Sequence, residues 1–293
     1  MEGHGQSPGL PAHPQHPQPS RGRRGRGRGP LSAVSPGARA RVIPEGFSAA
    51  DLHAHTLASD GMVSSRQLVE AARRAGLAVV GVTDHDTMAG VPEALAAGPE
   101  LGVEVVAGEE ITTGGLGKVH VLGLFLTGPV RMGMSVEDTI RAVHDQGGLA
   151  VLAHPFMPTY FASITPASLR RLLARTPVDG VELRHTALTT PMRSRQLDQF
   201  YELHHDRMGA AIGSSDSHFG ARDLARNVTL FAGTGAADLR RAMEEATTRP
   251  LERYLVPPGP ALADRLRQQG RSLGWLTWQR LTGRVGREGA LPA

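Results

Sequence analysis

From about residue 48 to 249, short apolar runs alternate with longer stretches in which apolar residues recur at helical spacing. The apolar runs predict strands, and the amphipathic stretches predict helices between them. The predicted strands are 49–53, 78–83, 103–107, 119–125, 149–153, 179–184, 210–213 and 228–231. The predicted helices are 65–75, 88–97, 135–146, 166–175, 191–207 and 236–247. Such alternation is typical of a parallel α/β sheet or barrel.

Two flanking segments depart from this pattern. Residues 1–45 are rich in Pro, Gly, Gln and Arg, so we expect a disordered tail. Residues 257–293 open with a Pro-rich stretch and become basic, and we expect an amphipathic helix there. This helix would dock on the barrel or on a second subunit, with a membrane surface or nucleic acid as alternatives. The predicted domains are therefore a tail over 1–45, one large domain over 46–256 and a basic extension over 257–293.

Charge and composition narrow the class of protein. The net charge is +4, yet the Arg-rich flanks carry the excess and the middle of the chain is acidic. An acidic middle is expected of a domain whose carboxylates are offset by bound cations. The chain contains no cysteine, so any metal must be held by nitrogen and oxygen atoms. We find neither a secretory signal nor an apolar run of the roughly 18 residues that cross a membrane, and we expect a cytoplasmic protein.

Acidic residues and histidines gather in six short clusters, and one further histidine, His120, stands alone in an apolar run. The clusters are Asp51-Leu52-His53-Ala54-His55, Ser59-Asp60-Gly61, Thr83-Asp84-His85-Asp86, Glu109-Glu110, Ala153-His154-Pro155 and Ser215-Asp216-Ser217-His218. Most of them follow predicted strands, whose C-terminal ends converge on one face of a βα barrel. Imidazole and carboxylate are ligands of zinc, manganese and iron, and a set this large predicts several ions. Clustered ions of this kind hydrolyse phosphate esters.

Taken together and in this order, the clusters resemble the motifs of the PHP family, which is named for polymerase and histidinol phosphatase. The resemblance covers about 51–249 and implies a distorted (β/α)7 TIM-like barrel. It also implies a trinuclear metal site at the C-terminal face of the strands. The implied ligand sets are His53, His55, Glu110 and Asp216 for one ion, Glu110, His120 and His154 for a second, and Asp60, His85 and His218 for a third. Manganese, zinc or iron would suit these ligands, with magnesium as an alternative.

The same resemblance implies a hydrolase that acts on phosphate esters. We expect in-line attack on phosphorus by metal-bound hydroxide, with His218 or a metal-bound water protonating the leaving oxygen. Glu110 would bridge two ions, whereas Glu109 would point to the other face of the strand. Asp51, Asp84 and Asp86 are expected to orient other residues of the site. The candidate catalytic residues are His218, Asp216 and Glu110, and the candidate contacts to substrate phosphate are Arg184, His185 and Arg222.

Small nucleotides or nucleoside 3′,5′-bisphosphates are the predicted substrates. A 5′-3′ exonuclease on short oligonucleotides is one alternative, and a histidinol or sugar phosphate phosphatase is another. Only 33 residues separate His120 from His154, so the sizeable insertion that many nucleotide-specific relatives carry there is missing.

Two further classes stay open. An amidohydrolase also begins with His-x-His, although its usual bridging lysine would have to be Lys118, the only lysine of the chain. The other is a nucleic-acid-binding module with structural metals, whose Arg-rich flanks would grip short RNA or DNA.

Overall fold

The structure is a computed structural model that describes residues 43–115, 118–157, 162–186, 190–253 and 259–282. The tail predicted over 1–45 lies almost wholly outside the described residues, and so do the first and last parts of the predicted extension over 257–293. The predicted α/β domain lies within them except for short gaps.

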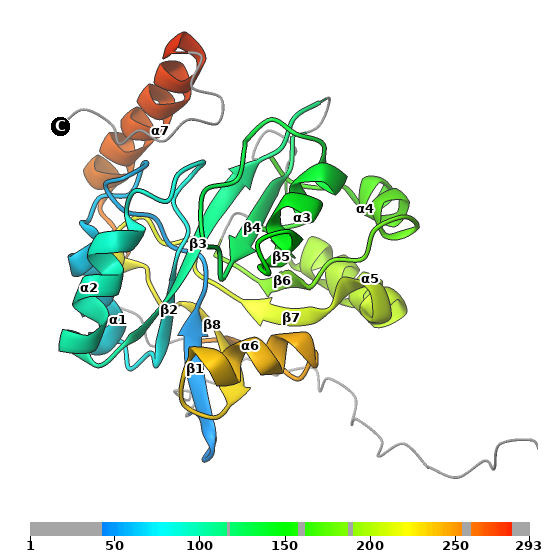
Figure 1. Ribbon diagram of the computed structural model, residues 1–293, viewed down its shortest axis with the longest axis horizontal. Coiled ribbons are helices and arrows are strands. Elements are labelled where there is room, and N and C mark those ends of the chain that lie inside the picture. Colours follow the sequence, from blue (N-terminus) through cyan, green and yellow to red (C-terminus); the bar gives the residue numbers. More distant parts are fainter. Residues whose placement is uncertain (1–42, 116–117, 158–161, 187–189, 254–258, 283–293) are drawn as a thin grey trace, which may run out of the picture. The chain divides into compact units, whose positions relative to one another are not determined.

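The described residues form one nine-stranded sheet in the order β7-β6-β5-β4-β3-β2-β1-β8-β9 (Figure 1). The strands are β1 (Phe47–Asp51), β2 (Val79–Val82), β3 (Glu104–Thr112), β4 (His120–Leu124), β5 (Leu149–Leu152), β6 (Gly180–Arg184), β7 (Ala210–Gly213), β8 (Asn227–Ala232) and β9 (Arg249–Glu252). Pairing is parallel from β1 to β3 and from β5 to β7. Strand β4 is antiparallel to both neighbours, and β8 is antiparallel to β1 and β9.

The two ends of the sheet meet through β7 and the segment that follows it. The Thr229 hydroxyl of β8 accepts a hydrogen bond from Gly213 N at 3.1 Å and donates one to Gly213 O at 2.9 Å. Beyond the strand ends, His55 N donates to Ser217 O at 2.8 Å and Ser217 N donates to His53 O at 3.1 Å. The fold is therefore the predicted distorted TIM-like α/β barrel, nearly closed. This closure brings the cluster after β7 beside the cluster after β1.

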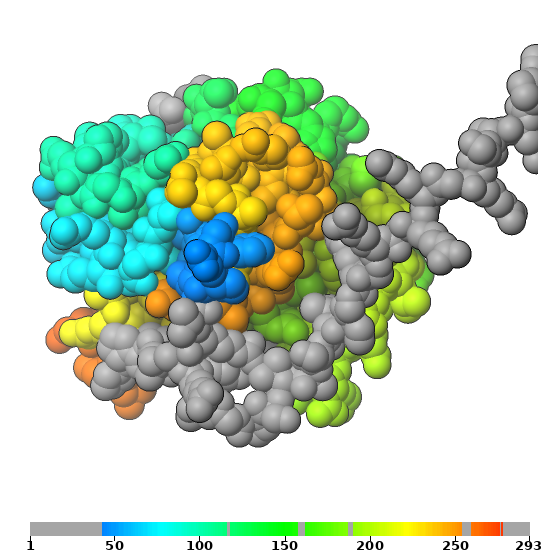
Figure 2. Space-filling view, turned by 90° about the horizontal axis from the view of Figure 1, so that it is seen from below, coloured from blue at the N-terminus to red at the C-terminus, as the bar shows by residue number. Residues whose placement is uncertain are grey.

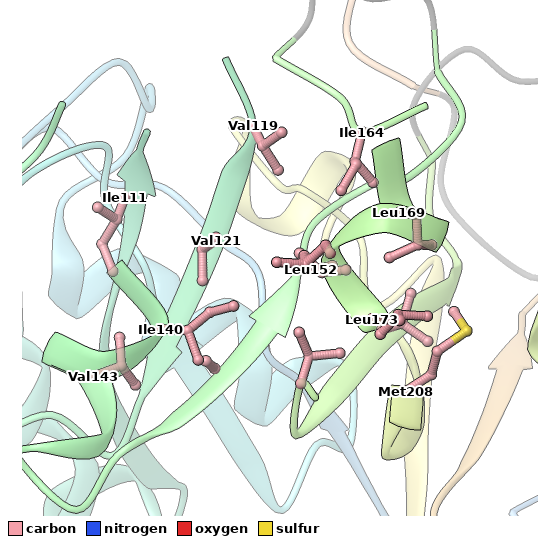
Figure 3. Close-up of a cluster of buried hydrophobic side chains, with 14 of the residues drawn as sticks. Ile111, Val119, Val121, Ile140, Val143, Leu152, Ile164, Leu169, Leu173 and Met208 are labelled. Carbon is pink, nitrogen blue, oxygen red and sulfur yellow. The ribbon is translucent and has the colours of Figure 1, made fainter. Parts of the chain in front are cut away.

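Helices cover the outside of the barrel (Figure 1). They are α1 (Ser65–Arg74), α2 (Val91–Leu101), α3 (Val136–His144), α4 (Pro166–Leu173) and α5 (Pro191–Met208). Local sequence sets where they begin. The Ser64 hydroxyl accepts from Gln67 N in a capping box at the start of α1, and the Ser135 hydroxyl accepts from Asp138 N at the start of α3. Figure 3 shows one outer core, where Ile140 of α3 and Leu169 of α4 pack against the strands near Leu152.

Apolar residues fill the barrel itself at its lower end. Along β5, Leu149 and Val151 join the interior cluster while the alternate residues join the outer core, as the twofold period of a strand requires. Helix α6 (Ala236–Glu244) closes this end, since Leu239 and Met243 belong to the same interior cluster as Phe231. Figure 2 views this face from below and shows α6 lying next to the start of β1. Apolar side chains thus occupy the lower end of the barrel, and the charged side chains lie at the opposite end.

Within the basic extension the structure has helix α7 (Leu262–Thr282), which lies on the side to which β1 points (Figure 1). Its Trp275 side chain is buried, and Asp264 forms an ion pair with Arg222 in the loop after β7. In the described part of the chain, no helix combines the length and hydropathy needed to cross a membrane.

Candidate metal centre

The polar clusters converge at the C-terminal ends of the strands. Five of their histidine rings and that of His120 form a continuous group in which neighbouring ring centroids lie 4.2 to 5.8 Å apart. These rings belong to His53, His55, His85, His120, His154 and His218. They come from residues that span 165 sequence positions, so the barrel topology alone brings them together.

The Glu110 carboxylate lies at the centre of this group. Its Oε1 atom is 2.7 Å from His120 Nδ1 and 3.0 Å from His154 Nε2. Its Oε2 atom is 3.0 Å from His85 Nδ1, 3.1 Å from His53 Nε2 and 3.3 Å from His55 Nε2. One carboxylate that faces five imidazoles through two oxygens has the position of a bridging ligand.

Two further carboxylates complete the group. Asp216 Oδ1 is 3.1 Å from His55 Nε2 and 3.4 Å from His53 Nε2. Asp60 Oδ1 is 3.3 Å from His218 Nε2, 3.8 Å from His55 Nδ1 and 4.0 Å from His85 Nε2. Each carboxylate thus lies at a separate side of the histidine group.

Three sets of side chains offer ligand atoms that all lie within 4.8 Å of one another. These sets are His53, His55, Glu110 and Asp216; His55, Asp60, His85 and His218; and His85, Glu110 and His120. The first set is the one that the sequence implies. The second set adds His55 to the predicted ligands Asp60, His85 and His218. The third set contains His85 in place of the predicted His154, although His154 Nε2 lies 3.0 Å from Glu110 Oε1.

The geometry fits bound cations better than it fits hydrogen bonding. Among the described residues, His53 Nε2, His120 Nδ1 and Asp60 Oδ1 are buried and make no hydrogen bond. Buried polar atoms are costly when unpaired, and close nitrogen–oxygen approaches without hydrogen-bond geometry are expected where both atoms face a shared cation. The donors are imidazole nitrogen and carboxylate oxygen, which suit zinc, manganese and iron alike.

The electrostatics favour the ionised carboxylates that a cation requires. Burial alone would raise the pKa of Glu110, but the neighbouring imidazoles, His120 and His53 foremost, bring this pKa well below its usual range. Burial likewise opposes ionisation of Asp216, whose pKa is nevertheless held well below its usual range, chiefly by His53. In contrast, burial lowers the pKa of His85 to about 3, so its ring is neutral and can donate a lone pair to a metal.

The PHP domain model matches residues 51–246, which is most of the chain and includes every predicted ligand. The chain belongs to the PHP domain family. It is 45% identical over 75 residues to a 5′-3′ exoribonuclease of Haemophilus influenzae, covering 25% of this chain and 27% of that enzyme. It is also 35% identical over 75 residues to a 3′,5′-nucleoside bisphosphate phosphatase of Chromobacterium violaceum, covering 25% of this chain and 26% of the phosphatase. The matches therefore span about a quarter of these relatives.

A solved structure of a Bacteroides vulgatus two-domain protein, containing a predicted PHP-like metal-dependent phosphoesterase, shares the fold. The TM-score is 0.62 at 21% identity, and the likeness covers 79% of this chain and 74% of that one. This likeness supports the barrel fold.

The PHP domain also contains a buried carboxylate, Glu182, for which the sequence analysis had predicted no role in the site. Glu182 Oε1 accepts from His53 Nδ1 at 2.9 Å and from the Ser214 hydroxyl, while Oε2 accepts from His154 N at 2.6 Å. A carboxylate that holds one nitrogen of a histidine fixes the orientation of the other, and here His53 Nε2 faces Glu110. The available signal was a charged residue between the apolar residues Val181 and Leu183 of a strand.

Other carboxylates hold the loops of the PHP domain in place. Asp84 accepts from Thr56 N at 2.7 Å and from the Ser59 hydroxyl at 2.6 Å, and so fixes the turn that carries Asp60. The same turn requires Gly61, because a Cβ atom there would lie 2.4 Å from His55 O. Asp51 is likewise buried and accepts from Ser215 N at 2.9 Å. These contacts support the predicted orienting roles.

Backbone strain marks two of the predicted ligands. His154 has a φ of +28° and Asp216 a φ of +50°, in the region that side-chain-bearing residues seldom adopt. Such strain persists only where the surroundings over-determine the conformation, and it concentrates at functional sites.

The predicted substrate contacts lie around this group. The His185 ring centroid is 6.5 Å from that of His154. Arg184 pairs with Asp198 at 2.7 and 3.1 Å, and Arg222 pairs with Asp264 of α7. Both guanidinium groups therefore have carboxylate partners, and a phosphate would have to compete with them. The contact roles of all three residues stay predictions.

The side chain of Glu109 lies apart from that of Glu110, as predicted from the sequence. Its Oε2 accepts from Val130 N at 2.7 Å, and Oε1 makes no hydrogen bond among the described residues. Burial raises the pKa of Glu109 to about 8. Glu109 thus lies outside the histidine group and offers an internal control for Glu110.

Proposed function

We propose that this PHP-domain protein is a metal-dependent phosphoesterase that hydrolyses small phosphomonoesters, with nucleotides and nucleoside 3′,5′-bisphosphates as the substrate class. The observation that carries the proposal is the Glu110 carboxylate, whose two oxygens lie within 3.3 Å of five histidine nitrogens. Such an arrangement is suited to adjacent cations, and paired cations are the usual apparatus for phosphate ester hydrolysis.

The nucleotide part of the proposal rests on the relatives. One is an exoribonuclease and the other is a nucleoside bisphosphate phosphatase, so both act on nucleotide phosphoesters. The shared barrel and the match to the PHP domain support the hydrolytic chemistry more broadly.

Each residue of the site would contribute a distinct property. Divalent cations, when bound, lower the pKa of water and neutralise charge on phosphate oxygens. Glu110 and Asp216 would supply the negative charge that retains the cations, and both are ionised at neutral pH. Glu182 would keep His53 in one orientation, so that the ring nitrogen facing Glu110 stays available.

His218 is proposed to act either as a ligand or as the proton source for the leaving oxygen. Burial alone would lower its pKa, but Asp60 and Asp216 raise the pKa of His218 to about 10. The two roles make different predictions for His218→Asn. Loss of a ligand lowers the Mn²⁺ content of the protein, whereas loss of a proton source leaves the content unchanged and slows turnover.

Phosphate release from Mn²⁺-loaded protein tests the proposal, with nucleoside monophosphates, nucleoside 3′,5′-bisphosphates, short oligoribonucleotides and sugar phosphates as substrates. We expect turnover of the first two groups and a loss on the order of 10²-fold or more for Glu110→Gln. Glu109→Gln is the matched control, because it makes the same chemical change one position away and outside the histidine group.

Equal activity of Glu110→Gln and Glu109→Gln would overturn the assigned site. Hydrolysis restricted to oligoribonucleotides would move the substrate class to short nucleic acids and would contradict the phosphomonoester assignment.

A further inference from the structure

Helix α7 lies beyond residues 51–246, the range of the PHP domain match, yet one of its faces contacts the turn that carries Asp60. The residues of this face are Gln268, Arg271, Ser272 and Trp275, which are spaced by three, four and seven positions and so share one side of a helix. Gln268 is 6% exposed and Trp275 is 2% exposed, whereas Leu266 and Leu273 of the opposite face are 64% and 65% exposed. The helix is therefore seated through its polar face.

The contacts of this face reach a predicted metal ligand directly. Asp60 Oδ2 accepts a hydrogen bond from Gln268 Nε2 at 3.1 Å and another from the Ser272 hydroxyl. Arg271 donates from one guanidinium nitrogen to Leu57 O at 3.1 Å and to Ser59 O at 3.0 Å. Both the side chain of Asp60 and the backbone before it are thus held from α7.

The two oxygens of Asp60 have different surroundings as a result. The Oδ2 atom has two donors from α7, whereas Oδ1 makes no hydrogen bond among the described residues and faces His218 Nε2 at 3.3 Å. A buried carboxylate oxygen needs donors, and the donors of α7 satisfy the one that points away from the histidines. The carboxylate is therefore oriented with a single oxygen toward the histidine group.

We propose that α7 is a structural part of the metal centre, and that Gln268 and Ser272 are positioning residues that make Asp60 a ligand through Oδ1 alone. The proposal rests on the metal centre described above and deepens it. The ion concerned is the one that His55, Asp60, His85 and His218 could hold. Asp60 belongs to this set and to neither of the other two.

The test is Mn²⁺ binding by the full chain, which is measured by calorimetric titration and by electron paramagnetic resonance. A double variant, Gln268→Met with Ser272→Ala, removes both donors while keeping the size of the glutamine side chain. We expect one class of Mn²⁺ site to weaken by about 10- to 100-fold, the effect typical of losing a partner that orients a ligand. The remaining sites should keep their affinity.

Four further variants make the result specific. Asp60→Asn should abolish the same class of site, because it removes the ligand itself. Ser272→Thr keeps the hydroxyl and should keep wild-type affinity, whereas Ser272→Ala should weaken it. Leu273→Ala lies on the exposed face of α7 and should leave Mn²⁺ binding unchanged. Circular dichroism of each metal-free variant reports whether α7 and the barrel stay folded.

The outcomes separate this proposal from the metal centre on which it rests. If Asp60→Asn loses a site but the double variant binds Mn²⁺ as the wild type does, α7 has no positioning role and the metal centre stands. Equal loss of every site in the double variant would also overturn the proposal, because α7 would then act on stability as a whole. If Asp60→Asn binds Mn²⁺ unchanged, the ligand assignment itself fails.

Discussion

The two ends of the barrel are built from the same strands but hold opposite kinds of side chain. At the lower end, Phe231 and Leu239 belong to an apolar cluster that α6 closes. At the upper end, His53 and Glu110, which are just as deeply buried, lie in a group of histidines and carboxylates. Burial of apolar surface stabilises the fold, whereas burial of charge costs free energy unless the charges are paired. The comparison indicates that the lower end provides the stability and that the upper end depends on it.

Truncation of the apolar end should have the largest effect on folding. Phe231→Ala removes a fully buried ring and should lower the free energy of unfolding by about 3–5 kcal/mol, as is typical of large cavities. Urea denaturation measures this loss. Because Phe231 lies outside the ligand sets, Mn²⁺ affinity of the folded variant should stay at the wild-type value. A large fall in affinity would show that the two ends are not independent.

Removal of metal should destabilise the protein without unfolding it. Ions that bind only the folded state at 100 times their dissociation constant add about 2.7 kcal/mol of stability per site. We expect a chelator to lower the melting temperature of the Mn²⁺-loaded protein and to leave its circular dichroism spectrum at room temperature unchanged. An unchanged melting temperature would argue against cation binding at the upper end.

Loss of the carboxylate that holds His53 should have an intermediate effect. Glu182→Gln keeps the shape of the side chain but weakens its hydrogen bond with His53 Nδ1, so Mn²⁺ affinity should fall by about 10- to 100-fold. Calorimetric titration measures the change. Glu109→Gln is the control, because it alters a buried carboxylate that lies outside the site. Wild-type affinity in Glu182→Gln would mean that packing alone orients His53.

The stability of the protein should also depend on pH, through Glu109. Burial raises the pKa of Glu109 to about 8 from an ordinary value of 4.5. The unfolded chain therefore loses this proton at lower pH than the folded protein, and the stability that the proton contributes declines as pH rises from 4.5 to 8. Between pH 5 and 8, the wild type should therefore lose more unfolding free energy than Glu109→Gln does, by up to about 3 kcal/mol. Urea denaturation of both proteins at several pH values checks this, and parallel curves would contradict it.

Sequence periodicity predicted most of the barrel because its strands are apolar and its helices amphipathic. Strand β9 was missed, since Arg249–Glu252 is short, charged at both ends and contains Pro250, all features of an edge strand. The antiparallel directions of β4 and β8 were also not predicted. The direction of a strand depends on how the loops cross the sheet, and hydrophobic periodicity does not encode the path of a loop.

The site, too, could be predicted only in part from the sequence. Eight of the nine predicted ligands lie in short clusters and the ninth, His120, in an apolar run, so their residue types and order were visible in the chain. The contacts of Gln268 and Ser272 with Asp60 join positions 208 and 212 residues apart, and no local pattern distinguishes these two residues from the polar surface of an ordinary helix. Partners that orient ligands are therefore seen only once the chain is folded.

Anomalous diffraction from crystals grown with Mn²⁺ tests the central claim most directly. We predict anomalous peaks within coordination distance of Glu110, with at least one peak shared between its oxygens and the rings of His53 and His55. Data that show no peak among these side chains, while Mn²⁺ is bound elsewhere on the protein, would contradict the account.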